Sequence, residues 1–229
     1  MLNKIKKALY SLYLTNSFGY KLKQTSNPVE KKRLRLAYSE AQLATLSIRV
    51  KVENKEKLPQ TGQYVVLINH RSIIDPPIVE VALKETQIFG PWIAKKELYN
   101  SFFFGLFVRN GGSILLDREK NQMSGFFAEI KESVKRGESI FIFPEGTRNK
   151  SNMSLTTFKE GSRIIALKNK IPILPIYIKT NAEEVLGRAL ADKHLEQEVL
   201  MVIGDIIDYK EKTNLELLYR KMFNLDKKV

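Results

Sequence analysis

Short apolar runs alternate with helical patterns along most of the chain. From Lys51 onward, several runs have the length and apolar content of buried β-strands: 63–69, 112–117, 138–144, 173–178 and 198–207. Helical periodicity lies between them, as at 122–135 and 157–169. This alternation predicts an α/β fold with a mostly parallel central sheet flanked by helices, whose ligands gather at the carboxyl ends of the strands.

Two further helical patterns precede the strands. In the first, apolar residues recur at spacings of three and four, with lysines between them: Leu2, Ile5, Leu9, Leu12 and Tyr13. The second covers about residues 30–50, and the turn residues 26–28 separate the two. We therefore expect an N-terminal amphipathic helical hairpin over residues 1–50, followed by one larger domain over residues 51–229.

The chain is strongly basic. The formal net charge is +13, and residues 1–38 hold nine basic residues against the single acid Glu30. A basic amphipathic helix is typical of a segment that lies in the interface of an anionic membrane. The alternative is that the apolar faces of both helices pack on the rest of the protein. We expect no nucleic-acid partner, because no binding motif is recognisable and the basic cluster lies on an apolar stripe.

The composition limits which catalytic groups and metal sites the chain can contain. The chain has 229 residues, 43% of them hydrophobic, which is enough for one well-packed domain. It has no cysteine and only two histidines, His70 and His194, so we expect no thiol nucleophile and no metal centre built from cysteine or histidine. We also expect no metal site of another kind and no bound cofactor. No apolar run approaches the roughly 18 residues of a spanning helix, and no signal peptide is recognisable. We expect a monotopic or peripheral protein at the cytoplasmic face of a membrane.

One histidine lies in a suggestive position. In LINHRSIIDPP, residues 67–77, His70 ends an apolar run and four residues separate it from Asp75. A histidine whose ring is held by an aspartate can act as a general base. A strand that runs into a helix explains the segment equally well, with Asp75 as the N-cap and Pro76 in the first turn. His194 lies in a polar helical pattern and is expected to have no role.

A second segment combines charge with a tight turn. In FIFPEGTR, residues 141–148, a buried strand ends in a turn of mixed chemistry: Glu145, Gly146, Thr147 and Arg148. Such a loop can bind a phosphate, although a solvated turn is the alternative. The segment NGGSILLDR, residues 110–118, repeats the design with Arg118 at the end of a strand.

Taken together, these segments resemble the glycerolipid acyltransferases. Four motif blocks of that family have matches here in the family's order: NHRSIID (69–75), GGSILLDR (111–118), FPEGTR (143–148) and IPILPIYI (171–178). The similarity is closest to the 1-acylglycerol-3-phosphate acyltransferases and covers roughly residues 45–180, including AKKEL (94–98) and FFG (103–105). Phe102 departs from the family, which commonly has proline before FFG.

The resemblance implies a reaction. A fatty acyl group would pass from acyl-CoA or acyl-carrier protein to the sn-2 hydroxyl of lysophosphatidic acid (1-acylglycerol 3-phosphate), giving phosphatidic acid. Glycerol 3-phosphate or another lysophospholipid is the alternative acceptor. A non-catalytic, basic membrane-binding protein is the alternative from a different class.

The resemblance also implies residue roles. His70 would take the proton of the acceptor hydroxyl, since imidazole titrates near neutral pH, and Asp75 would hold the ring. The reaction needs no enzyme nucleophile. Ser72 is a weak candidate for one because it lacks a glycine-flanked nucleophile elbow.

The phosphate of the acceptor requires cations. Arg118 and Arg148 are the expected clamps, and Lys95 is a weaker candidate. Glu145 is expected to orient an arginine or to accept a glycerol hydroxyl. Two turn residues would bring hydrogen-bond donors close to the acceptor: Gly146 and Thr147. The apolar stretch 101–108 would either line an acyl tunnel or belong to the core.

Overall fold

Strands and helices alternate along the chain. The computed structural model describes residues 2–117, 123–191 and 196–225. Within those ranges, the helices are α1 (Leu2–Lys23), α2 (Pro28–Thr45), α3 (Asp75–Ala82), α4 (Lys96–Tyr99), α5 (Gly105–Asn110), α6 (Met123–Lys135), α7 (Gly161–Asn169), α8 (Ala182–Ala191) and α9 (Leu215–Met222), with a short 3₁₀ helix at Lys55–Lys57. The strands are β1 (Ile48–Glu53), β2 (Val65–Ile68), β3 (Ile93–Lys95), β4 (Ile114–Leu116), β5 (Ile140–Ile142), β6 (Ile173–Ile178) and β7 (Gln197–Ile203).

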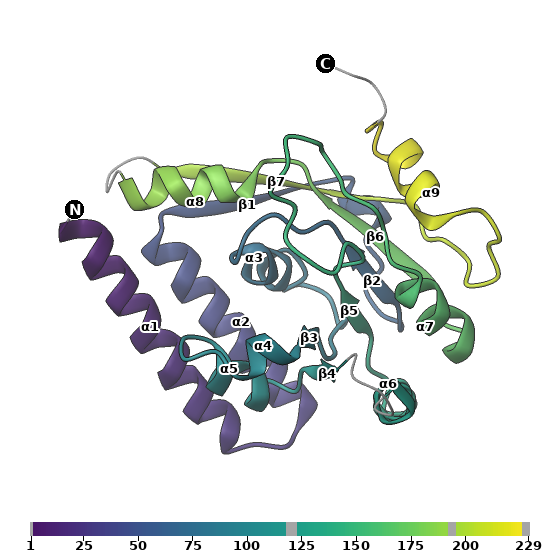
Figure 1. Cartoon of the computed structure of the whole chain (residues 1–229), viewed down its shortest axis with the longest axis horizontal. Coiled ribbons are helices and arrows are strands. Elements are labelled where there is room, and N and C mark those ends of the chain that lie inside the picture. Colours follow the sequence, from purple (N-terminus) through teal and green to yellow (C-terminus); the bar gives the residue numbers. More distant parts are fainter. Residues whose placement is uncertain (1, 118–122, 192–195, 226–229) are drawn as a thin grey trace.

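A five-stranded sheet lies at the centre, in the order β1-β7-β6-β2-β5. Its neighbouring strands are parallel except for the pair β6 and β7. Strands β3 and β4 form a second, parallel pair, and a parallel bridge between Trp92 and Phe141 joins that pair to β5. The predicted mostly parallel sheet flanked by helices is confirmed (Figure 1).

Strand β2 is buried on both faces. Val66 and Ile68 belong to the core under α2, α3 and α8, whereas Val65 and Leu67 belong to the core under α6, α7 and α9. Figure 1 shows these two groups of helices on opposite sides of the sheet. All four β2 side chains are fully buried, as expected of a central parallel strand. The residue that follows such a strand is therefore fixed by packing on both sides.

The predicted end of the second helix was wrong. The helix expected to reach residue 50 ends at Thr45, and β1 begins at Ile48. Residues 48–53 read IRVKVE, in which apolar and charged residues alternate. That period of two suits a strand with one solvated face, and β1 lies at the edge of the sheet beside β7. Strand β1 therefore crosses the expected division at residue 50.

A buried ion pair ties α2 to the rest of the protein. The guanidinium of Arg35 donates from Nε to Glu80 Oε1 at 2.8 Å, and from its two terminal nitrogens to the carbonyls of Gly111 (2.9 Å) and Gly90 (3.0 Å). The Arg35 and Glu80 side chains are only 8% and 9% exposed. Removing one partner of such a pair leaves an uncompensated buried charge, so α2 is part of the folded core.

Helix α1 has one packed face and one exposed face. At Gly19 a Cβ atom would lie 2.9 Å from Leu106 Cγ, so only glycine allows α1 to approach α5 this closely, and Asn110 Nδ2 donates to the Gly19 carbonyl at 3.1 Å. Thr15 Oγ1 and the Tyr38 hydroxyl, 3.0 Å apart, join α1 to α2. The opposite face presents large apolar side chains to solvent: Ile5, Leu9, Tyr10, Tyr13 and Tyr20.

Candidate active site

The site is built where β2 ends and α3 begins. His70 follows the buried strand, and its Nδ1 lies 2.8 Å from Oδ2 of Asp75, the first residue of α3. The same oxygen accepts the backbone N–H groups of Arg71 (2.7 Å) and Ser72 (2.8 Å). Asp75 is 1% exposed, whereas the His70 side chain is 18% exposed. Three hydrogen bonds thus hold the carboxylate through Oδ2, whereas its Oδ1 is buried and has no hydrogen-bond partner among the described residues. Of the two side chains, only the imidazole is reached by solvent.

These hydrogen bonds decide the tautomer of His70. An ionised aspartate only accepts hydrogen bonds, so we assign the proton to Nδ1 and the free lone pair to Nε2. Nε2 has no hydrogen-bond partner in the part of the chain that the structure describes. The ring also stacks on Phe143, with centroids 3.9 Å apart and planes 11° apart, and Trp92 stacks behind Phe143 at 5.1 Å. A ring fixed in this way can accept a proton at Nε2.

Glu145 is bonded to the backbone of His70. It follows β5 and is 3% exposed. Its Oε1 accepts the backbone N–H of His70 at 2.7 Å, and its Oε2 accepts the N–H and hydroxyl of Thr156 at 2.8 and 2.5 Å. The backbone N–H of Asn149 donates to the His70 carbonyl at 2.6 Å. The two sequence segments are therefore joined through the backbone of His70.

The turn after Glu145 presents an arginine to solvent. Gly146 has φ +70°, a conformation that favours glycine, and its N–H donates to the Phe143 carbonyl at 3.0 Å. Thr147 and Arg148 are both exposed. Within the described residues the Arg148 guanidinium makes no ion pair or hydrogen bond, so it is available to an anion.

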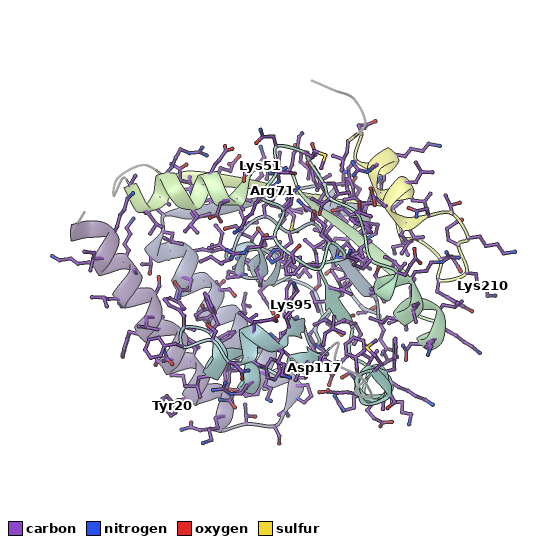
Figure 2. The ribbon with its side chains drawn as sticks, viewed as in Figure 1. Tyr20, Lys51, Arg71, Lys95, Asp117 and Lys210 are labelled. Carbon is purple, nitrogen blue, oxygen red and sulfur yellow. The ribbon has the colours of Figure 1, made fainter. Side chains whose placement is uncertain are left out.

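The other predicted cation positions differ. Lys95 ends β3 and is half-buried, beside the end of β4 (Figure 2). Arg118 lies outside the described residues. Its neighbour Asp117 is buried at 6% exposure and pairs with Lys96, whose Nζ lies 2.9 Å from Asp117 Oδ2.

The apolar stretch 101–108 is partly core and partly surface. Gly105 and Val108 are buried, but Phe102 is 88% exposed in the turn before α5. This stretch packs against α1 through Leu106 and Phe107. A groove of about 580 Å³ runs along α1, and none of its lining residues belongs to the His70 site.

Sequence reasoning missed several residues that support the site. Asn69 is buried and bonds to the backbone of Ile178 at both its oxygen (2.7 Å) and its nitrogen (3.1 Å). Its only signal was its place beside His70. Phe143 stacks on His70, and Thr156 bonds to Glu145. These contacts join segments that are apart in sequence, and no local sequence pattern predicts them.

Two kinds of feature are absent from the described residues. No group of three or more His, Cys, Asp or Glu side chains in the described ranges could hold a metal ion. Among the described helices, none is long and apolar enough to cross a membrane.

Fold and site are those of an α/β enzyme with a histidine–aspartate pair at the carboxyl end of its central sheet. A protein-family model described as "Acyltransferase" matches residues 49–179, and the chain belongs to that family of acyltransferases. The resemblance stated from the four motif blocks is thereby confirmed.

Individual relatives agree. The chain is 31% identical over 172 residues to the 1-acyl-sn-glycerol-3-phosphate acyltransferase of Helicobacter pylori, an alignment that covers 74% of this chain and 71% of the relative. It is 36% identical over 132 residues to the enzyme of the same name from Bacillus subtilis, covering 57% of this chain and 63% of the relative.

A solved structure shares the fold. The crystal structure of the 1-acyl-sn-glycerophosphate (LPA) acyltransferase from Thermotoga maritima superimposes with a TM-score of 0.67 at 21% identity, covering 97% of this chain and 92% of that chain. The architecture therefore extends over almost the whole of this chain, including the N-terminal helices.

Proposed function

We propose that this protein transfers a fatty acyl group from a thioester, acyl-CoA or acyl-carrier protein, to the sn-2 hydroxyl of lysophosphatidic acid, giving phosphatidic acid. Relatives that carry this activity in their names are 31% and 36% identical to this chain over the aligned residues. The family model matches residues 49–179, a range that contains all four motif blocks. The observation that carries the proposal is the 2.8 Å pair of His70 Nδ1 and Asp75 Oδ2, with Nε2 left unpaired among the described residues.

His70 is the proposed general base. As the acceptor oxygen attacks the thioester carbonyl carbon, Nε2 takes the hydroxyl proton, and the buried carboxylate of Asp75 stabilises the imidazolium. The tetrahedral intermediate then collapses, the carbon–sulfur bond breaks, and the departing thiolate takes the proton from Nε2. No covalent enzyme intermediate forms. Ser72 is fully buried, so a substrate does not reach its hydroxyl.

Arg148 is the proposed phosphate clamp. Its exposed guanidinium sits on the turn that begins at Glu145, whose carboxylate bonds to the backbone of His70. A guanidinium binds phosphate through two parallel hydrogen bonds. Lys95 and Arg118 remain proposed contributors, together with the Thr147 hydroxyl. The Gly146 N–H already donates to the Phe143 carbonyl, so the proposed part of Gly146 is the tight turn that brings Arg148 close to the site. A direct contact of Glu145 with the acceptor also stays a prediction.

The N-terminal hairpin, helices α1 and α2 of the expected unit 1–50, is proposed to dock the catalytic domain, expected over residues 51–229, on an anionic membrane at its cytoplasmic face. Lysophosphatidic acid and phosphatidic acid are lipids, so the site has to meet a bilayer surface. Helix α1 offers both forces that interfacial binding uses: an exposed apolar face that includes Leu9 and Tyr13, and a run of lysines. Figure 2 shows Tyr20 on the outer side of this helix.

Product identification tests the reaction. Purified protein is offered acyl-CoA and acyl-carrier protein in turn, each with lysophosphatidic acid, glycerol 3-phosphate or a lysophospholipid with a headgroup. Mass spectrometry identifies the products. Phosphatidic acid as the main product supports the proposal. If glycerol 3-phosphate were the only acceptor to give a product, the protein would catalyse the preceding acylation instead. No product from any pair of donor and acceptor would favour the non-catalytic membrane-binding alternative.

A further inference from the structure

Helix α9 makes hydrogen bonds to residues 155–158, a loop segment that also bonds to Glu145. Glu216 Oε2 accepts the backbone N–H of Phe158 at 2.9 Å, and Arg220 donates from a terminal nitrogen to the Leu155 carbonyl at 3.2 Å. The two side chains also pair with each other, with Arg220 Nε 2.8 Å from Glu216 Oε1. The pair therefore fixes the first and last residues of the segment 155–158.

That segment in turn holds the residue under His70. Thr156 lies between the two fixed ends and donates its N–H and hydroxyl to Glu145 Oε2. The other oxygen of Glu145 accepts the backbone N–H of His70. Hydrogen bonds from α9 thus hold the residues on either side of Thr156. Thr156 and Glu145 then bond onward to the backbone of the residue proposed as the base.

The pair on α9 differs from an ordinary surface ion pair. Its side chains are 24% exposed at Arg220 and 20% at Glu216, and each also bonds to a backbone group of another segment. Tyr219, between them on the helix, is fully buried, and its hydroxyl donates to the Ile176 carbonyl at 2.5 Å. Its ring packs edge-on against Phe158 at 5.2 Å. Exposed ion pairs contribute little to stability because water screens their charges. The pair of Glu216 and Arg220 is instead held in place by its backbone hydrogen bonds and by the buried Tyr219 between them.

We propose that Glu216 and Arg220 are positioning residues for His70. They lie beyond residues 49–179, which the family model matches, and they act through Thr156 and Glu145 rather than by touching a substrate. The inference rests on the proposed function. Small displacements of a reacting group have large effects on rate, and about 1 Å can cost about 100-fold.

The test compares variants of α9 in the full-length protein. Glu216→Leu removes the acceptor for the Phe158 N–H, and kcat should fall about 10- to 100-fold while the KM for the acyl donor changes less than about twofold. Glu216→Gln keeps an accepting oxygen for the Phe158 N–H and turns its NH₂ group toward Arg220, a partly exposed side chain to which water can bond instead. This variant should recover kcat to within about threefold of the unmodified protein. Thr156→Val removes only the hydroxyl bond. Combined with Glu216→Leu it should add little, because both changes loosen the same support of Glu145 by the segment 155–158.

Asn214→Ala is the matched control. Asn214 caps α9 through the Leu217 N–H at 3.1 Å and makes no bond to residues 155–158. Losing the cap should lower the Tm by about 2–4 °C, yet leave kcat at 25 °C unchanged. If Asn214→Ala lost as much kcat as Glu216→Leu, or if Glu216→Leu kept the unmodified kcat, the positioning role would be overturned.

Amide hydrogen exchange gives a readout that does not need turnover. Glu216→Leu should speed exchange in peptides covering 69–75, which include the His70 amide, and Asn214→Ala should speed it only within α9. Equal exchange of 69–75 in the unmodified protein and Glu216→Leu would contradict the inference. An unmodified protein without any turnover would contradict the proposed reaction instead, and the exchange result would still decide the positioning role.

Discussion

Replacing Glu145 with glutamine should damage the protein because the carboxylate accepts hydrogen bonds at both ends. Oε1 accepts the His70 N–H at 2.7 Å, and Oε2 accepts the N–H and hydroxyl of Thr156. An amide has one accepting oxygen. In either orientation its NH₂ group faces a backbone N–H, which cannot accept a hydrogen bond, so one buried donor loses its partner.

The size of the loss follows from those contacts. A hydrogen bond to a charged group contributes about 1.5–3 kcal/mol, and a buried donor left without a partner costs about 1–3 kcal/mol. Allowing for relaxation of the loop, we expect the free energy of unfolding to fall by about 3 kcal/mol. Because one of the disturbed donors is the amide of His70, kcat should also fall at least about tenfold.

Urea denaturation and steady-state kinetics check both numbers. Glu160→Gln is the matched control, since Glu160 is an exposed carboxylate near the same loop and its loss should change stability by less than about 0.5 kcal/mol. The KM for lysophosphatidic acid separates the two roles of Glu145. A Glu145→Gln protein that is as stable as the unmodified one but has a raised KM would refute this reasoning and favour a direct contact with the acceptor.

The remaining predictions concern the phosphate, the membrane and alkaline pH. Arg148→Ala should raise the KM for lysophosphatidic acid about 10-fold or more, with only partial rescue by Arg148→Lys; an unchanged KM would move the clamp elsewhere. Leu9→Ser with Tyr13→Ser should weaken co-sedimentation with anionic vesicles about 10- to 100-fold while leaving turnover of a short-chain, soluble acceptor intact; equal binding would place the membrane contact on another surface. Burial, and to a lesser extent Glu129, raises the pKa of Tyr99 to about 12. As the pH rises, the unfolded chain therefore loses this proton before the folded protein does, so the free energy of unfolding should fall from about pH 10 to 12. Tyr99→Phe should reduce that fall by about 1 kcal/mol in denaturation curves recorded at alkaline pH. An unchanged fall in the variant would contradict the raised pKa of Tyr99.

Substitutions suit the membrane test better than deletion of the N-terminal residues. A deletion of residues 1–38 would remove Arg35 and leave Glu80 buried without its cation. Such a protein would be expected to unfold, whether or not α1 binds lipid. Changes on the exposed face of α1 separate the two effects, because Leu9 and Tyr13 are 62% and 65% exposed.

The local part of the site could be read from the sequence. His70 and Asp75 are close along the chain, and a buried strand that runs into a helix brings them together without help from distant residues. The central strands were recognisable for a similar reason, since an all-apolar run such as 173–178 has few alternatives. Strand β1 was missed although IRVKVE alternates, because the helical pattern before it was extended too far.

The long-range part could not be read in this way. Glu145 bonds to His70 across 75 positions of sequence, and Glu216 bonds to Phe158 across 58. Such contacts depend on how the loops fold over the sheet, and residue type alone gives no signal of them. Glu145 illustrates the difference. Its charge suggested that it orients an arginine or accepts a glycerol hydroxyl, whereas its burial and its three donors indicate support for the histidine.

Phosphatidic acid formation by the unmodified protein and by His70→Ala tests the central claim most directly. Both proteins receive an acyl thioester and lysophosphatidic acid, and product is measured by mass; His194→Ala, which removes the other histidine, serves as control. The account predicts turnover by the unmodified and His194→Ala proteins and a loss of at least about 10²- to 10⁴-fold for a folded His70→Ala protein. A His70→Ala protein that forms phosphatidic acid at the unmodified rate would contradict it.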